Sequence, residues 1–164
     1  MIVDKRTTEM MFSSEDLNAV TPQDFFEQLN EEFDFETDLA ADEKNTKCKY
    51  YYDAEANALE QDWTGRCWCN PPYGRKIGQW VDKAADSPDA LVVMLLPART
   101  DTRWFSTIAD TADEIRFVQG RLKFEGNDAS APFPSMIVIW YGRNFYKIGN
   151  YPEGPYNWNL IWRR

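Results

Sequence analysis

The chain has 164 residues, of which 43% are apolar and 15% aromatic, so it can bury the core of one compact domain. This composition excludes a disordered chain, and the net charge of -9 argues against a protein that binds nucleic acid mainly through bulk positive charge. No apolar run has the length of a membrane span, and the first residues lack the apolar segment of a secretory signal, so we expect a cytoplasmic protein.

The charge is distributed unevenly along the chain. Residues 1–62 have a net charge of -12, whereas residues 63–164 have a net charge of +3. This asymmetry predicts that the second part faces an anion while the first part turns away from it. An acidic part that only keeps the protein in solution explains the same numbers equally well.

Three cysteines and no histidine limit the metal chemistry that the chain can support. Cys67 and Cys69 lie two positions apart in a predicted strand, so their side chains point to the same face. Because the chain has no CxxC pair, we predict no metal site and interpret the cysteines as reduced, small core residues.

The first predicted element is a helix in "TPQDFFEQLNEEF", residues 21–33. Thr21 suits the N-cap position and Pro22 the first helical position. Phe25, Leu29 and Phe33 recur every four residues, which gives the helix one apolar face.

Strand and helix patterns alternate after this helix. An alternating run ends near Asp38, and a tyrosine cluster at 50–52 predicts a short strand. The remaining predicted elements are a strand at 65–70, a helix at 76–86, a buried strand at 90–98, a helix at 102–112, strands at 114–124 and 135–141, and a loop through the 120s and early 130s.

This order predicts an α/β fold with a mostly parallel sheet. The last two strands are joined by a loop too short for a helical crossover, so we expect them to pair antiparallel. We expect one domain over residues 1–164, with a core at about 12–141 and a C-terminal tail at 142–164. Asp38 and Asn70 both follow predicted strands, and such sheets bind ligands at the carboxyl ends of their strands.

The stretch "WCNPPYGR" contains the most informative residues of the chain. Two prolines fix their own φ and hold the preceding residue extended, so Asn70 to Pro72 form a stiff bend. The Asn70 side-chain oxygen and the proline carbonyls are rigid acceptors that suit an amino group with two hydrogens. Tyr73 offers a flat face on which a base can stack. The alternative is an ordinary turn after a strand, with a buried tyrosine.

These residues resemble the Asp/Asn/Ser-Pro-Pro-Tyr/Phe motif of amino-group methyltransferases. Together with "TPQDFFEQLNEEF", "DLAADEKNTKC", "VVMLLPARTDTRWF", "GRLKF" and "APFPSMIVIW", the chain resembles the bacteriophage DNA N6-adenine methyltransferase family, which is related to Dam. The resemblance covers about residues 12–141. It implies a Rossmann-like class I methyltransferase sheet, S-adenosyl-L-methionine as cofactor, DNA as partner, and a phage or prophage origin.

The resemblance also implies roles for single residues. Asn70 and the Pro71 carbonyl would accept hydrogen bonds from the adenine N6 amino group, Pro72 would shape the bend, and Tyr73 would stack on a flipped adenine. The implied cofactor-binding residues are Thr21, Pro22, Asp38, Ala40, Ala41 and Asn70. Asp38 as a solvated loop acid, and Thr21 with Pro22 as a plain helix start, are the alternatives.

Basic residues after the predicted strands are candidates for contacts with DNA phosphates or the base. They are Arg75, Arg99, Arg103, Arg121 and Lys123. Ser135 is a further candidate for the cofactor or base pocket. Solvated surface positions explain the arginines and the lysine as the alternative.

The chain departs from the family's pattern in three ways. Ala19 stands where family members often carry an aromatic residue, which affects one contact to the cofactor. The glycine-rich FxGxG loop of larger relatives is replaced by the segment around "DLAA". No separate target-recognition domain fits into the chain, so base readout falls to short loops such as 120–134.

Two other functions stay open from the sequence. Enzymes that methylate a protein glutamine or an RNA base also carry this motif, and the pI of about 4.6 suits them. The second is a non-catalytic relic that binds DNA or a host protein, against which the intact motif argues.

Overall fold

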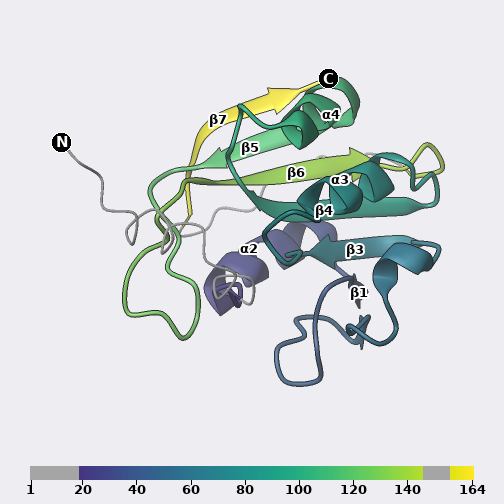
Figure 1. Ribbon diagram of the computed structural model, residues 1–164, viewed down its shortest axis with the longest axis horizontal. Coiled ribbons are helices and arrows are strands. Elements are labelled where there is room, and N and C mark those ends of the chain that lie inside the picture. The colour runs from purple at the N-terminus through teal and green to yellow at the C-terminus, as the bar shows by residue number, and fades with distance from the viewer. Residues whose placement is uncertain (1–18, 146–155) are drawn as a thin grey trace.

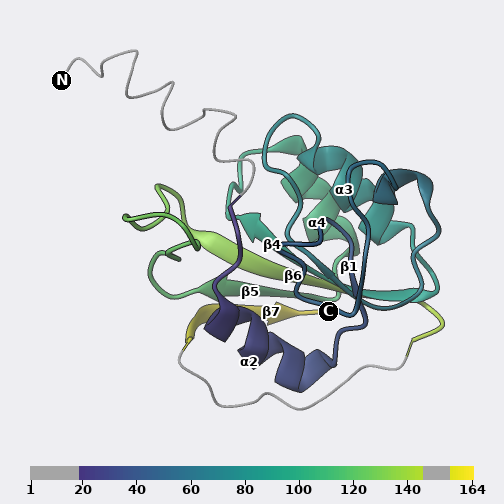
Figure 2. The ribbon, with the colours of Figure 1, turned by 90° about the horizontal axis from the view of Figure 1, so that it is seen from below.

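Seven strands form one sheet in the part of the chain that this computed structural model describes, residues 19–145 and 156–164 (Figure 1). Within these residues, one helix covers one face of the sheet and two helices cover the other (Figure 2). The strands are β1 (Thr37–Asp38), β2 (Tyr50–Tyr51), β3 (Gly65–Cys69), β4 (Ala90–Pro97), β5 (Glu114–Val118), β6 (Ser135–Tyr141) and β7 (Trp158–Arg163); the helices are α2 (Gln23–Phe33), α3 (Ile77–Ala85) and α4 (Arg103–Thr111), with a 3-10 turn η2 at Ala58–Glu60.

The predicted α/β class is confirmed, but the prediction of a mostly parallel sheet is wrong. The sheet order is β2-β1-β3-β4-β6-β5-β7, and only the pairs among β2, β1, β3 and β4 are parallel. β6 lies between β4 and β5 and is antiparallel to both, which confirms the predicted antiparallel pairing of β5 with β6. Because a loop without a helical crossover connects β5 to β6, the chain returns in the opposite direction. The mixed sheet is consistent with a methyltransferase fold.

Strand β7 was not predicted, because it lies in what the sequence indicated was a tail. It pairs antiparallel with β5 at the edge of the sheet. Leu160 and Trp162 on it are 59% and 38% exposed. Apolar residues stand next to one another at 160–162, so the sequence does not show the alternation of a half-buried strand. Residues 12–18 of the predicted core and residues 146–155 of the predicted tail lie outside the described residues.

Helix α2 carries the predicted apolar face, and that face is buried. Phe25, Phe26, Leu29 and Phe33 are at most 3% exposed, and the ring of Phe26 packs edge-on against Trp68 of β3. The predicted N-cap is wrong by one residue, because α2 starts at Gln23 and its N-cap is Pro22.

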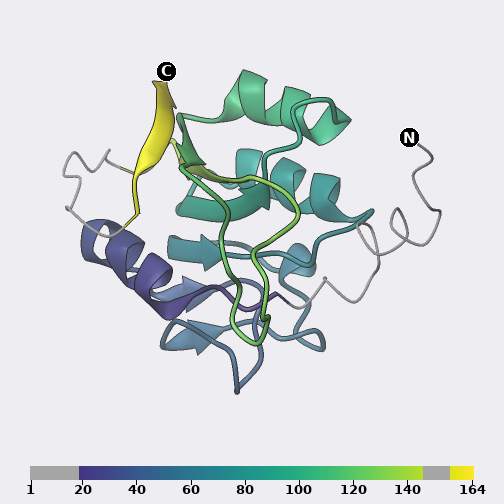
Figure 3. The ribbon, with the colours of Figure 1, turned by 90° about the vertical axis from the view of Figure 1, so that its left-hand side faces the viewer.

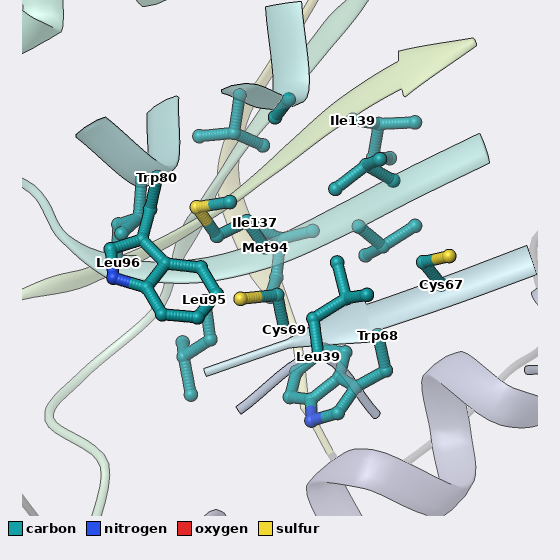
Figure 4. Packing of buried hydrophobic residues seen from close by; sticks show 14 of the residues in the cluster. Leu39, Cys67, Trp68, Cys69, Trp80, Met94, Leu95, Leu96, Ile137 and Ile139 are labelled. Atoms are coloured by element: carbon teal, nitrogen blue, oxygen red, sulfur yellow. The ribbon is translucent and has the colours of Figure 1, made fainter. Parts of the chain in front are cut away.

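The opposite face of the sheet packs against α3 and α4. Every residue of β4 is buried, which confirms the prediction of a strand covered on both faces. Figure 4 shows Cys67 and Cys69 of β3 among the buried side chains, with Trp80 of α3 on the side of Cys69. Burial raises the pKa of both thiols, so they act as core residues.

The predicted strand at 114–124 is confirmed only for its first half. β5 ends at Val118, and Gly120 has a φ of 77°, which turns the chain out of the sheet. The loop that follows, residues 119–134, runs across one edge of the sheet before β6 begins (Figure 3). No helix among the described residues is long and apolar enough to cross a membrane.

A buried ion-pair cluster ties α2 to the antiparallel half of the sheet. Arg116 of β5 bonds both carboxylate oxygens of Glu32 on α2, at 2.6 and 2.7 Å, and also bonds Glu114. The side chains of Arg116 and Glu32 are each 1% exposed. Because desolvated charges must be paired, this cluster fixes how α2 lies on the sheet.

We predict that Arg116→Leu lowers the free energy of unfolding by about 3–5 kcal/mol, because it removes the cation that bonds both oxygens of the buried Glu32 carboxylate. Urea denaturation measures the change. Arg103→Leu removes an exposed arginine instead and should cost less than about 0.5 kcal/mol. Equal losses in the two variants would show that the cluster does not hold the fold.

Candidate functional site

The carboxyl ends of β1, β3 and β4 meet at one edge of the sheet, as parallel pairing predicts. Asp38 ends β1 beside Trp68 of β3, and Asn70 follows β3 directly. Figure 3 faces the edge that loop 119–134 crosses. The two residues that the sequence placed at strand ends therefore lie side by side at the position where such sheets bind ligands.

A pocket opens at this edge, and we call it the first pocket. Six of the residues predicted to act on cofactor or base line it: Thr21, Asp38, Ala40, Ala41, Asn70 and Pro72. Pro22 does not line it, because it is buried and serves as the N-cap of α2, where its carbonyl accepts the first helical hydrogen bond from Phe26 at 3.0 Å.

The Asp38 carboxylate is buried in the wall of the first pocket and is 3% exposed. Its Oδ1 accepts the backbone N–H of Ala40 at 3.2 Å, and its Oδ2 accepts the backbone N–H of Lys47 at 3.1 Å. Burial raises the pKa of Asp38 from 3.8 to about 6, and the two backbone hydrogen bonds only partly oppose that shift. The solvated loop acid is therefore excluded as an interpretation of Asp38.

The Asn70 side chain is fixed by its amide nitrogen. Nδ2 donates to the carbonyl of Ala19 at 2.7 Å and to Oγ1 of Thr21 at 3.1 Å. Both partners are acceptors toward the amide, so the nitrogen faces them and Oδ1 faces the other way. No described residue donates to Oδ1. Thr21 thus holds Asn70 instead of capping α2.

Tyr73 packs inside the protein in this structure. Its ring is 8% exposed, and its hydroxyl donates to the carbonyl of Leu95 at 3.3 Å. The rings of Phe133 and Phe124 meet it edge-on, with centroids at 5.6 and 6.4 Å. Burial raises the pKa of the Tyr73 hydroxyl, which excludes a phenolate at neutral pH.

A second pocket lies next to these rings. It is lined by Ala19 and by residues of loop 119–134, namely Phe124, Asn127, Asp128, Ala129, Ser130, Ala131, Pro132 and Phe133. Ala19 lines both pockets, so the segment before α2 forms the wall between them. Ala19 contributes only a methyl side chain to that wall.

Ser135 begins β6 opposite Pro97, the last residue of β4. It is 1% exposed, and its Oγ has no hydrogen-bond partner among the described residues. Neither pocket includes Ser135 in its lining. Ser135 therefore lies at the edge of the sheet where β4 ends, but it does not line either pocket.

The predicted DNA-binding cations lie on loops and at the start of α4. Arg99 follows β4, and its guanidinium lies 5.9 Å from the ring centroid of Phe133, at the rim of the second pocket. The other four are exposed: Arg75, Arg103, Arg121 and Lys123.

Several residues that line the first pocket were not among the predicted site residues. They include Lys47, Trp80 and Asp53, and Asp53 lies two positions beyond the end of β2, whereas Asp38 is the last residue of β1. The position of Asp53 after a short tyrosine strand was a usable signal. Lys47 and Trp80 gave none, because a loop lysine and a helical tryptophan have ordinary surface and core explanations.

Comparisons with known proteins show what this chain is similar to. The profile of the family described as DNA N-6-adenine-methyltransferase (Dam) matches residues 7–148 of the chain. A DNA N-6-adenine-methyltransferase of Haemophilus phage HP1 is 34% identical over 139 residues, which cover 78% of this chain and 80% of the phage protein. Another, of Escherichia phage T1, is 34% identical over 100 residues, which cover 57% of this chain but only 42% of the phage protein.

We predict that Asp38→Asn changes how stability depends on pH. The raised pKa means that wild-type protein loses stability as Asp38 ionises, between pH 3.8 and about 6. The asparagine cannot ionise, so the unfolding free energy of the variant relative to wild type should rise by about 1–2 kcal/mol between pH 5 and 7.5. Urea denaturation at several pH values measures this, with exposed Asp62→Asn as control. A pH-independent difference would contradict it.

Proposed function

This chain belongs to the Dam family of DNA N-6-adenine-methyltransferases, and we propose that its target adenine enters the second pocket, next to the Ala19 wall that Asn70 holds from the side of the first pocket. The chain is an adenine-specific DNA methyltransferase by that membership. The roles of single residues are our proposal, and the orientation of the Asn70 amide carries it.

Asn70 presents an acceptor to an amino group. Because Nδ2 is held by Ala19 and Thr21, the oxygen is left as the group that a substrate donor meets. The adenine N6 amino group is a planar donor of two hydrogens, and the carbonyl of Pro71 is the second acceptor in the same stiff bend. Two fixed acceptors raise the electron density on nitrogen and need no reorganisation during the reaction.

The first pocket suits S-adenosyl-L-methionine. When bound, this cofactor supplies an electrophilic methyl group on a sulfonium. Asp38 and Asp53 offer carboxylates for its polar groups, and the small side chains of Ala40 and Ala41 let it approach the backbone. Trp80 adds an apolar surface to the same lining. These residues combine apolar surface with a few polar groups, which is the usual composition of a cofactor site.

The second pocket suits a base. An adenine inside a duplex must leave the stack before its N6 is accessible, and it then needs an apolar or aromatic pocket. Phe124 and Phe133 line this pocket, and Tyr73 packs against both rings. Since the Tyr73 ring is 8% exposed, a base stacks on it only after Phe133 and its loop have moved aside.

The chemistry needs no strong general base. Asn70 and Pro71 position the amino group, and the proton that nitrogen releases passes to solvent after the transfer. A chain without histidine, in which the buried Tyr73 hydroxyl stays protonated, is compatible with this mechanism. The exposed Arg121, Lys123 and Arg75 would contact phosphates, which offsets the net negative charge of the chain.

We predict that Asn70→Ala lowers kcat by about 100- to 1,000-fold, because loss of one fixed polar contact to a reacting group has this effect in other enzymes. Incorporation of labelled methyl groups into unmethylated DNA measures the rate. Asn159→Ala is the matched control, since Asn159 is exposed on β7. Circular dichroism checks that both variants fold. A kcat within threefold of wild type in Asn70→Ala would sink the proposed role.

For the cations, we predict a change in salt dependence. In Arg121→Gln combined with Lys123→Gln, the slope of log K for DNA against log salt concentration should become shallower by about 2, one for each lost phosphate contact. Fluorescence anisotropy over a salt series measures the slope. Lys49→Gln, a change of an exposed lysine beside β2, should leave it unchanged. An unchanged slope in the double variant would place DNA elsewhere on the protein.

A further inference from the structure

The wall between the two pockets is held from both sides. Asn70 bonds the carbonyl of Ala19 from the carboxyl end of β3. From the other side, the backbone N–H of Glu125 donates to the carbonyl of Val20 at 2.9 Å, and the two residues form an isolated antiparallel bridge. Loop 119–134 is therefore attached to the segment that both pockets share.

Lys47 adds a second attachment between this loop and the first pocket. Its Nζ donates to Oε1 of Glu125 at 3.2 Å and to Oε1 of Gln23 at 2.9 Å. Its side chain is 9% exposed, whereas that of Glu125 is 45% exposed. Because the Lys47 side chain is largely buried, water and salt screen its attraction to Glu125 less than they screen an ion pair between two exposed side chains.

Both ends of this ion pair lead directly to a pocket. The backbone N–H of Lys47 bonds the Asp38 carboxylate, and Lys47 itself lines the first pocket. Glu125 follows Phe124, whose ring lines the second pocket. A continuous series of contacts thus runs from Asp38 through Lys47 and Glu125 to Phe124.

We propose that the Lys47–Glu125 ion pair couples the cofactor pocket to the base pocket, and that Lys47 is a positioning residue for loop 119–134. The inference rests on the proposed function of the two pockets. A ligand in the first pocket restricts Lys47, and Lys47 then restricts Glu125 and the adjoining Phe124. A base that binds next then loses less conformational entropy in ordering the loop, so the two ligands bind cooperatively without a change of fold.

Hydrogen exchange on the full chain tests the coupling with S-adenosylhomocysteine as the probe. In wild type, saturating probe should slow exchange in peptides of the first pocket and, by about fivefold or more, in peptides of loop 119–134. In Glu125→Gln, the first-pocket peptides should still slow, while the effect on the loop should fall below about twofold. Glu31→Gln, which neutralises an exposed carboxylate on α2, should behave as wild type.

Lys47→Met provides the second variant, because it breaks the same pair from the other end. Loop protection that persists in both variants overturns the coupling, as does wild-type protein in which only the first pocket responds. A wild type in which the first-pocket peptides do not respond at all contradicts the proposed cofactor site, and the coupling falls with it. N6-adenine methylation by wild type is assayed in parallel, so a failed function is distinguished from a failed coupling.

Discussion

The site depends on two hydrogen bonds from one side-chain amide. Asn70 at the end of β3 donates to the carbonyl of Ala19 and to the hydroxyl of Thr21, and in doing so joins the central strands to the segment before α2. That segment forms part of both pockets, so the bonds that orient Asn70 also shape the wall around it. The prolines that follow Asn70 restrict its backbone, and together these constraints leave the side-chain oxygen little freedom.

The order of the strands brings the other parts of the site to the same edge. Because β6 inserts antiparallel between β4 and β5, its first residue lies opposite the last residue of β4. The loop that leads into β6 must therefore cross the carboxyl ends of the parallel strands, where it supplies Phe124 and Phe133. The second pocket thus comes from a connection that the sheet topology requires. The buried ion pair between Arg116 of β5 and Glu32 of α2 fixes the position of this helix on the sheet.

Local patterns predicted most of the fold. The fourfold repeat in α2, the continuous apolar run of β4 and the Asn-Pro-Pro-Tyr turn are each read from neighbouring residues, and Asp38 and Asn70 come together through the general rule for parallel strands. What could not be predicted depends on contacts between distant residues. Strand β7 exists because β5 offers it an edge, Thr21 bonds Asn70 instead of capping its own helix, and Lys47 meets a carboxylate 78 positions further along the chain. The prediction of a mostly parallel sheet was wrong for the same reason, because local sequence patterns do not show that β6 inserts between β4 and β5.

In the proposed function, Asn70 and its surroundings direct methyl transfer to the N6 amino group of adenine in DNA. The most direct test of this function is the identity of the product. Unmethylated DNA is incubated with the protein and radiolabelled S-adenosyl-L-methionine, digested to nucleosides, and separated by chromatography. We expect the label to elute as N6-methyl-2′-deoxyadenosine. Label in methylated deoxycytidine, or label found only when protein or RNA replaces the DNA, would contradict it.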